Sequence, residues 1–179
     1  GDTWYDTDND TYDVYINDEW KRFLGAGGGG TIDISNATYD SVSFSVASEE
    51  SSPRNLAFNA DGTKMYIVGT SSDSVHQYSL STAYDLSTAS YDSVSFSVAS
   101  QETNPIGLTF NTDGTKMYIV GFINDTVYQY NLSTGFNLST ASYGSVSFSV
   151  ASQETAPLSL TFNADGTKMY IVGNTNDSV

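Results

Sequence analysis

The sequence predicts an all-β protein built from tandem antiparallel sheets, and three observations support this fold class. First, a unit of 52 residues recurs: residues 41–92 and 93–144 are identical at 35 of 52 positions, and a further copy begins at residue 145. Second, Ser, Thr, Tyr, Val and Phe are abundant, whereas stretches rich in Ala, Leu, Glu and Lys are absent. Third, an Asp-Gly pair follows an apolar segment in every copy. A fixed period of this length indicates an array of supersecondary units, none of which buries its apolar face alone.

Four strands are expected in each copy. The first lies near residues 56–58 and is followed by a turn at 59–63, whose Asp-Gly pair is typical of a tight hairpin. The second, at 64–68, is almost entirely apolar, as in a strand covered on both faces. The third, at 74–80, and the fourth, at 93–99, alternate their side chains between two faces. Serines occupy one face of the fourth strand, which predicts an outer strand with one buried face.

Four antiparallel strands repeated at this period describe the blades of a β-propeller. Residues 41–48 are expected to be the outer strand of one blade, two full four-stranded blades follow, and the chain ends at Val179 within the third strand of another. The expected fold is therefore a partial β-propeller, an open arc of two full and two partial blades. Because a propeller needs about four to eight blades to close, we expect these residues to be a piece of a longer protein. A two-sheet sandwich could use the same strands, but the tandem period disfavours it.

The region before the repeats differs in composition. Residues 1–24 are expected to form a small acidic β-hairpin or three-stranded meander, residues 25–30 a Gly-rich linker, and residues 31–179 the repeat region. The expected strands of the first segment are 3–5, 12–16 and 19–23. A phosphate-binding loop is the alternative for the glycines, but the Lys-Ser/Thr pair of such a loop does not follow them.

Charge and composition exclude several classes of function. The chain has 21 acidic and 6 basic residues, a net charge of −15, and no cysteine. Such a field repels nucleic acid and anionic membranes, and the lack of cysteine excludes disulfides and thiol chemistry. No apolar run approaches the roughly 18–20 residues that a membrane-spanning helix requires. We therefore expect no nucleic-acid partner and no membrane span.

One metal site is a candidate. Asp6, Asp8 and Asp10 alternate as in the start of a Ca²⁺-binding loop. Thr11 stands where that loop requires glycine, and Asn17 stands where it requires a bidentate glutamate. An acidic turn is the favoured interpretation, so no cofactor is expected and Ca²⁺ is the alternative.

The sequence contains no residue pattern that is typical of a catalytic site. His76 is the only histidine and its counterpart one copy later is Tyr128, which indicates a packing position. With one His and no Cys, a conventional zinc site or a Ser-His-Asp triad is not expected. Glu50, Glu102 and Glu154 recur with the repeat, so they do not suggest one unique pair of catalytic carboxylates.

The repeat resembles a known class of propeller unit. Its segment Leu-x-Phe-Asn-x-Asp-Gly-Thr-Lys-Met-Tyr-Ile-Val-Gly, followed by Asp-Ser/Thr-Val-x-Gln-Tyr-x-Leu-Ser-Thr, is similar to YVTN/NHL-like β-propeller repeats over residues 41–179. It looks closest to arrays in marine tailed bacteriophages and some bacterial surface proteins. The opening Gly1-Asp2-Thr3-Trp4-Tyr5-Asp6, with Val14-Tyr15-Ile16 and Trp20, resembles a short segment of phage tail-fibre proteins. Together these resemblances imply a virion appendage or an adhesin, located on a virion or a cell surface, and they transfer no catalytic residues.

Comparison of the copies predicts where a ligand binds. The copies agree in the turn between the first two strands and differ most in the loop after the second strand and just before the first. Because antiparallel strands alternate in direction, these two variable regions are expected on one rim, where loops on a rigid scaffold usually carry recognition. Neutral drift in exposed loops also explains the variation. The candidate rim residues are Arg54, Asn55, Thr70, Ser71, Ser72, Ile106, Phe122, Ile123, Asn124, Leu158, Asn174 and Asn176.

The leading hypothesis is a non-enzymatic recognition module of a phage tail fibre or virion appendage. Its partners would be a host-surface glycan or protein, bound through the rim, and other subunits of the fibre. Phe122 and Ile123 would be apolar anchors and Arg54 a polar one. An exported or surface-anchored bacterial adhesin is the alternative, and a fragment of a propeller lyase or glycosidase is the third hypothesis.

Overall fold

The computed structural model describes residues 3–6, 11–16, 19–24 and 37–175. The chain divides into two compact units, residues 1–41 and 42–179. The first unit contains one antiparallel sheet in the order β1-β2-β3. Its strands lie within one residue of their expected bounds and are β1 (Thr3–Asp6), β2 (Thr11–Ile16) and β3 (Glu19–Leu24). Asp8, Asp10 and the expected linker lie outside the described residues, as does the side chain of Asp6, so the Ca²⁺ site stays a prediction.

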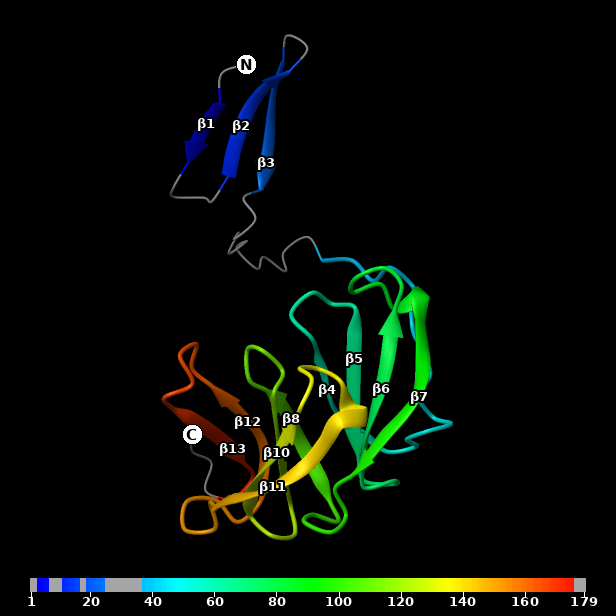
Figure 1. Ribbon diagram of the computed structural model, residues 1–179, viewed down its shortest axis with the longest axis vertical. Helices are drawn as coiled ribbons and strands as arrows, with labels where there is room; N and C mark the ends of the chain where they lie inside the picture. The colour runs from blue at the N-terminus through cyan, green and yellow to red at the C-terminus, as the bar shows by residue number, and fades with distance from the viewer. Residues whose placement is uncertain (1–2, 7–10, 17–18, 25–36, 176–179) are drawn as a thin grey trace. The chain divides into compact units, whose positions relative to one another are not determined.

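The second unit consists of three antiparallel sheets that follow one another along the chain (Figure 1). The first sheet comprises β4 (Pro53–Phe58), β5 (Lys64–Gly69), β6 (Ser74–Leu80) and β7 (Ala89–Ser97). The second comprises β8 (Pro105–Phe110), β9 (Lys116–Gly121), β10 (Thr126–Leu132) and β11 (Ala141–Ser149), and the third comprises β12 (Pro157–Phe162) and β13 (Met169–Gly173). In each sheet neighbours in sequence are neighbours in space, and the first strands β4, β8 and β12 lie side by side. The all-β prediction is confirmed: the helical residues described are two 3₁₀ turns, η1 (Leu86–Thr88) and η2 (Leu138–Thr140).

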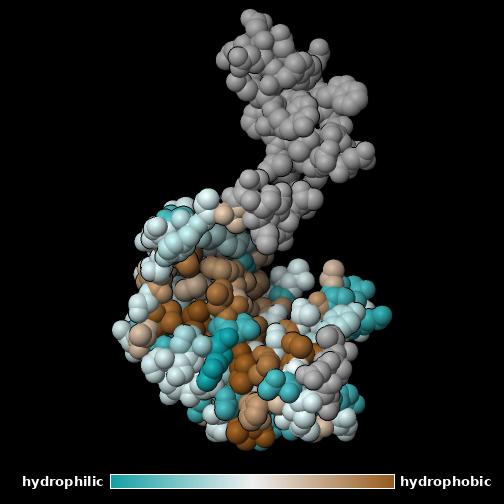
Figure 2. Space-filling view, turned by 180° about the vertical axis from the view of Figure 1, so that it is seen from behind, coloured by the Kyte–Doolittle hydropathy of each residue, from teal (hydrophilic) through white to brown (hydrophobic). Residues whose placement is uncertain are grey.

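The largest apolar core lies between the first and second sheets. Its buried members come from both sheets and from the segments next to them, and are Tyr66, Val68, Val75, Val98, Leu108, Met117, Ile119, Tyr130, Leu132 and Leu138. Each such side chain contributes about 1.5–3 kcal/mol when it leaves water, so neither sheet would keep this stabilisation alone. Apolar residues also reach the surface of this unit between hydrophilic ones (Figure 2). Among the described residues, no helix has the length and hydropathy needed to span a membrane.

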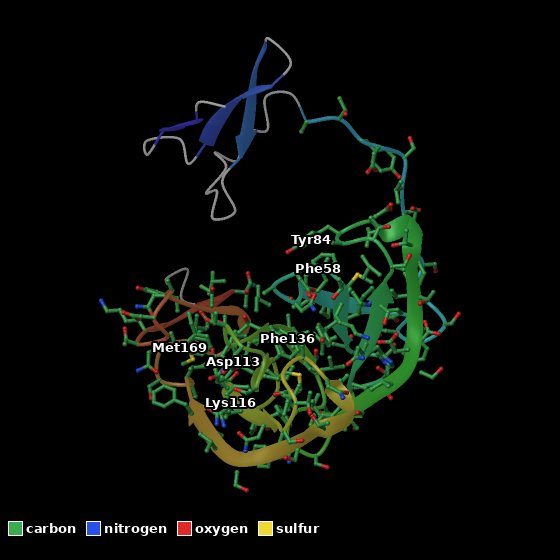
Figure 3. The ribbon with its side chains drawn as sticks, turned by 45° about the horizontal axis from the view of Figure 1, so that its top comes forward. Phe58, Tyr84, Asp113, Lys116, Phe136 and Met169 are labelled. Atoms are coloured by element: carbon green, nitrogen blue, oxygen red, sulfur yellow. The ribbon has the colours of Figure 1, made fainter. Side chains whose placement is uncertain are left out.

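The invariant turn between the first two strands is built by side-chain hydrogen bonds. Asn59 Oδ1 accepts from the backbone N–H of Lys64 at 2.8 Å, and Asp61 Oδ1 accepts from the N–H of Thr63 at 3.0 Å. Gly62 has φ +72°, a conformation that glycine adopts without strain. Tyr84, from the connection before η1, lies against this turn and beside Phe58 (Figure 3). The repeated sequence therefore encodes a local structure that each copy forms by itself.

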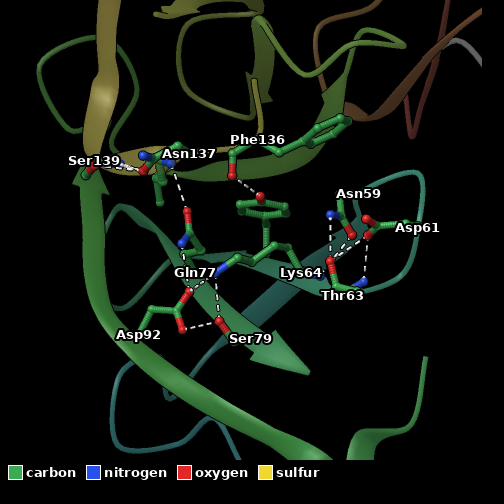
Figure 4. Close-up of polar contacts among 12 residues, drawn as sticks. Asn59, Asp61, Thr63, Lys64, Gln77, Ser79, Asp92, Phe136, Asn137 and Ser139 are labelled. Carbon is green, nitrogen blue, oxygen red and sulfur yellow. Dashed lines mark hydrogen bonds and ion pairs between the residues drawn. The ribbon is translucent and has the colours of Figure 1, made fainter. Parts of the chain in front are cut away.

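Hydrogen bonds also join the first sheet to the second. The side-chain oxygen of Gln77 accepts from the backbone N–H of Leu138 at 2.8 Å, and the Tyr66 hydroxyl donates to the backbone oxygen of Phe136 (Figure 4). The amide nitrogen of Gln77 donates to Asp92 at 2.7 Å, and Lys64 forms an ion pair with the same carboxylate at 2.8 Å. The Gln77 side chain is thus held in place while it bonds across the interface.

The fourth strand begins earlier than expected. β7 starts at Ala89 rather than at Ser93, and its pairing with β6 shifts between Gln77 and Tyr78. Residues Asp92 and Ser93 fall in this irregularity, where Ser93 has φ +57°. The expectation was wrong because alternation of apolar and polar residues begins only after the bulge, while backbone pairing continues on both sides of it.

Residues 41–48 do not form the expected strand. They run as coil and turn, because among the described residues no strand pairs with them. Their apolar side chains still pack on the first sheet: the ring of Phe44 lies edge-to-face on Tyr78 at a centroid distance of 5.6 Å. The described repeat region therefore has two four-stranded sheets and one two-stranded sheet, and this segment covers a sheet without belonging to one.

Candidate binding rim

The two variable regions of each copy meet at one end of their sheet. In the first copy the N–H of Thr70 donates to the backbone oxygen of Ser52 at 3.2 Å, and the N–H of Ser51 donates to Ser71 Oγ at 3.0 Å. The same backbone bond recurs as Phe122 N–H to Asn104 O and as Asn174 N–H to Ala156 O, each at 3.1 Å. The loop after the second strand and the connection before the first thus form one surface. The invariant turns leave these two strands at their other end.

Some candidate residues belong to strands rather than to the connection. Arg54 and Asn55 lie in β4, Ile106 in β8 and Leu158 in β12. In β4 the register shifts so that Pro53 pairs with Gly69 and Asn55 with Val68, which leaves Arg54 as the extra residue. The same shift recurs in β8 and β12. Bulges of this kind re-aim a side chain, so a strand position that differs in all three copies also departs from regular pairing.

A buried glutamate lies beneath the rim of the first copy. The Glu50 side chain is fully buried, and its carboxylate accepts from the backbone N–H of Ser52 at 2.7 Å and from those of Ser71 and Ser72 at 3.1 Å each. Both serine hydroxyls donate to it as well. Burial raises the pKa of this carboxyl, but the hydrogen bonds from Ser71, Ser72 and Ser52 outweigh burial and lower the pKa from 4.5 to about 2. The carboxylate is therefore ionised at neutral pH and fixes the backbone of both variable segments.

The other copies repeat this arrangement. Glu102 accepts from the N–H groups of Asn104, Ile123 and Asn124 at 2.8, 3.3 and 3.1 Å, and Glu154 accepts from those of Ala156 and Thr175 at 2.7 and 3.0 Å. A Cβ at Gly69, Gly121 or Gly173 would lie within 2.5 Å of this glutamate side chain, so glycine is required there. Sequence reasoning missed this role. The sequence did contain a sign of it, because this glutamate is the same in every copy while the residues on either side of it are not.

The side chains above the glutamate of the second copy face solvent. Phe122 and Ile123 keep 44% and 57% of their surface exposed. Asn124 Nδ2 donates to the backbone oxygen of Gln101 at 2.6 Å, which adds to the fixation of this loop. Two large apolar side chains are thus presented on a backbone that is held from below. Of the other candidates, Arg54, Ser71, Leu158 and Asn174 are also exposed, while Asn176 lies outside the described residues.

The single histidine lies under the rim. His76 is buried, and its Nε2 is 2.9 Å from the Ser72 hydroxyl. Burial lowers its pKa and outweighs the opposing effect of Glu50 and Glu49, so the ring is neutral at pH 7. The His76 side chain lies in the interior, as expected of a residue whose role is packing. Within the described part of the chain, no group of three or more His, Cys, Asp or Glu side chains could hold a metal ion.

Comparisons with known proteins relate the chain to solved structures. No family model matches the chain. No curated protein matches its sequence. A functionally unknown protein from Desulfotomaculum acetoxidans DSM 771 is similar in structure with a TM-score of 0.52, 16% identity, and coverage of 68% of this chain and 35% of that one. A protein from Lactobacillus plantarum gives a TM-score of 0.50, 16% identity, and coverage of 66% and 33%.

A candidate 6-phosphogluconolactonase from Bacteroides uniformis ATCC 8492 gives a TM-score of 0.48, 17% identity, and coverage of 66% of this chain and 34% of that one. The chain matches about a third of the length of each of these structures. At 16% identity, the first two similarities show a shared fold and assign no activity to this chain.

Proposed function

We propose that residues 42–175 form an arc of β-propeller blades whose rim recognises a host-surface glycan or protein without catalysis. Two complete four-stranded antiparallel sheets, with their first strands side by side and their faces packed together, support the propeller arrangement. The rim is the surface formed by the loops after β5, β9 and β13 and by the bulged starts of β4, β8 and β12.

One observation carries the proposal: the loop after β9 is held by hydrogen bonds to a buried glutamate and presents two apolar side chains to solvent. Glu102 fixes the backbone of Ile123 and Asn124, while the side chains of Phe122 and Ile123 remain in solvent. Binding to a fixed loop avoids part of the entropy cost of ordering it. Large exposed aromatic and aliphatic side chains on such a loop are suited to act as anchors.

The sequence resemblances support a proposal for the biological setting. The repeat and the opening segment resemble those of phage tail-fibre proteins, so we place the module in a virion appendage, with other fibre subunits as neighbours. Several copies of one rim in a fibre would raise the effective affinity of a weak site. A surface-anchored bacterial adhesin would use the same rim.

The double variant Phe122→Ser with Ile123→Ser tests the proposal. Fluorescently labelled protein is titrated onto a panel of fixed bacterial cells, untreated, treated with periodate to destroy glycans, or treated with protease. The wild type is expected to bind at least one cell type, and the double variant to bind it at least about tenfold more weakly, a loss of about 1.4 kcal/mol. The periodate and protease arms assign the target to glycan or protein.

Val146→Ser is the matched control, because Val146 is also exposed but lies in β11, away from the rim. It is expected to bind as the wild type does. Unchanged binding by the rim variant, with an unchanged melting temperature, would contradict the proposal that the rim binds the target. A wild-type protein that binds none of the cell types in the panel would contradict it as well.

A further inference from the structure

We propose that the first copy contains a pH-sensitive switch, in which protonation of His76 at mildly acidic pH loosens the rim loop 70–72 and the covering segment, residues 44–52. His76 is the only histidine of the chain, and it lies under the rim together with Glu50 and Ser72. The second copy has Tyr128 at the equivalent position, so the switch would act on one copy alone. An effect on target binding rests on the function proposed above, whereas the loosening is a property of the free protein.

A chain of side-chain hydrogen bonds determines which nitrogen of the neutral imidazole carries the hydrogen. The Ser72 hydroxyl donates to Glu50 Oε2 at 2.7 Å, so its oxygen is left to accept. His76 Nε2 lies 2.9 Å from that oxygen and is therefore the donor. The same carboxylate accepts from the backbone N–H groups of Ser71 and Ser72 at 3.1 Å each. The imidazole is thus connected, through one hydroxyl and one carboxylate, to the backbone of the rim loop.

The other ring nitrogen has no hydrogen-bond partner. His76 is 6% exposed, and its Nδ1 is buried without a partner among the described residues. In the neutral ring this nitrogen has only an unused lone pair. Protonation would place an N–H donor and a positive charge there, and a buried donor without an acceptor is costly. The site therefore accommodates the neutral ring better than the charged one.

The surroundings of the ring contain negative charge but are largely closed to water. The titratable groups that face the ring or its polar neighbours are Tyr78 on the same strand, Tyr91 on β7, and Glu49 and Glu50 on the covering segment. On β5 the residue paired with His76 is the apolar Ile67. The two glutamates favour the protonated ring, but burial opposes them and is the larger effect, so the pKa of His76 lies below its ordinary 6.5.

Acid therefore favours the open form of this site. Because folding lowers the pKa of His76, the exposed ring binds a proton more readily than the buried one. Its contribution to stability is present above pH 6.5 and is lost as the pH falls from 6.5 toward the lower pKa of the folded state. Exposure of the ring requires Glu50 and Ser72 to move away from it, and these residues belong to the covering segment and the rim loop. The Glu50 pKa of about 2 keeps that carboxylate ionised at pH 5.

The second copy has the same supporting structure without the titrating ring. Three positions of the cluster change together, to Gln101, Asn124 and Tyr128. Glu102 still fixes the loop, because it accepts from the backbone N–H of Asn124 at 3.1 Å. None of the three replacements exchanges a proton between pH 5 and pH 7. The loop 122–124 is therefore an internal control for the loop 70–72.

NMR spectroscopy of the single histidine tests the assigned protonation. The 179-residue protein is prepared without a histidine tag, so that His76 gives the only imidazole signals. Nitrogen-15 spectra at pH 7 should show the hydrogen on Nε2, and titration from pH 8 to pH 5 should give a pKa below 6.5. Hydrogen on Nδ1, or a pKa of 6.5 or higher, would overturn the proposal.

Hydrogen–deuterium exchange of the wild type at pH 7 and pH 5 tests the loosening, with rates corrected for the intrinsic effect of pH. Peptides that contain residues 44–52 and 70–72 should exchange severalfold faster at pH 5. The increase should not exceed about 25-fold, the limit for a group that has its ordinary pKa of 6.5 when exposed and stays neutral when buried. The peptide that contains residues 122–124 should exchange equally at both pH values.

Two variants remove the titrating ring. His76→Tyr introduces the residue of the second copy, and His76→Gln keeps a donor for Ser72. A variant that melts at pH 7 as the wild type does should show no faster exchange at pH 5. Equal exchange of the wild-type loop 70–72 at both pH values would overturn the proposal, and so would equal acceleration in the loop 122–124 or in a variant. None of these results bears on the target of the rim, which is tested on cells.

Discussion

Glu50 shows how one side chain organises a surface that is made of variable residues. Its carboxylate is buried, and it accepts hydrogen bonds from both segments of the rim. A buried carboxylate without such partners would be strongly destabilising. The repeat can therefore vary the side chains at 70–72 and 122–124 while the buried acid keeps the backbone of each loop in place.

The pKa of Glu50 predicts a pH dependence. Its folded-state pKa of about 2 lies below the ordinary 4.5, so the unfolded chain binds the proton more readily. The stabilisation is present above pH 4.5 and is lost as the pH falls from about 4.5 to about 2, with a total of about 3 kcal/mol at most. Glu50→Gln should be less stable than the wild type at pH 7, and the difference should shrink over that range.

Urea unfolding of both proteins between pH 7 and pH 2.5 measures this effect. Other carboxyls, among them Asp61 and Asp113, also have lowered pKa values and contribute equally to both proteins. Only the difference between the two stability curves therefore reports on Glu50. Parallel curves over the whole range would contradict the role assigned to this carboxylate.

At the residue scale, the sequence predicted what is local. The Asn and Asp side chains of the invariant turn bond within five residues of themselves, so their role follows from spacing alone. The partners of Glu50 at Ser71 and Ser72 lie 21 and 22 residues away. No local pattern encodes such contacts, which is why repetition of this acid suggested no structural role before the strands were placed in space.

At the element scale, the strands were predictable because their side chains alternate and their turns are marked. The errors occur where pairing, rather than side-chain pattern, decides the element. β7 extends through a bulge that interrupts its alternation, and residues 41–48 have the right alternation but no strand to pair with among the described residues. The bulges at Arg54, Ile106 and Leu158 could not be predicted from the sequence either, because a bulge depends on how two strands pair.

The contact between the first two sheets gives a matched pair of variants. Gln77→Leu should lower the free energy of unfolding by about 1–3 kcal/mol, because it leaves the buried N–H of Leu138 without its acceptor. Gln129→Leu makes the same change one copy later. Within the described residues that side chain has no hydrogen bond, so the expected loss is under about 0.5 kcal/mol.

Chemical denaturation of both variants at neutral pH checks this prediction. A loss for Gln129→Leu as large as that for Gln77→Leu would contradict the importance of the bond between the sheets. An unchanged stability of Gln77→Leu would do so as well.

At the scale of the whole molecule, the repeat region is a row of sheets that stabilise one another. The core between the first and second sheets contains fully buried residues from both. The outward faces are different: Leu56 in β4 is 53% exposed, and Phe148 in β11 and Tyr170 in β13 are also exposed. Apolar residues of one pattern are therefore buried where two sheets meet and exposed where the row is open, as expected for units that pack only on their neighbours.

Hydrogen–deuterium exchange of the variant Phe96→Ala tests this central claim most directly. Phe96 lies in the first sheet and contacts Tyr130 of the second. If the sheets stabilise one another, removing this ring will speed exchange in β9 and β10 as well as in β6 and β7. Faster exchange confined to the first sheet, with β9 and β10 protected as in the wild type, would show that each sheet is stable by itself and would contradict the account.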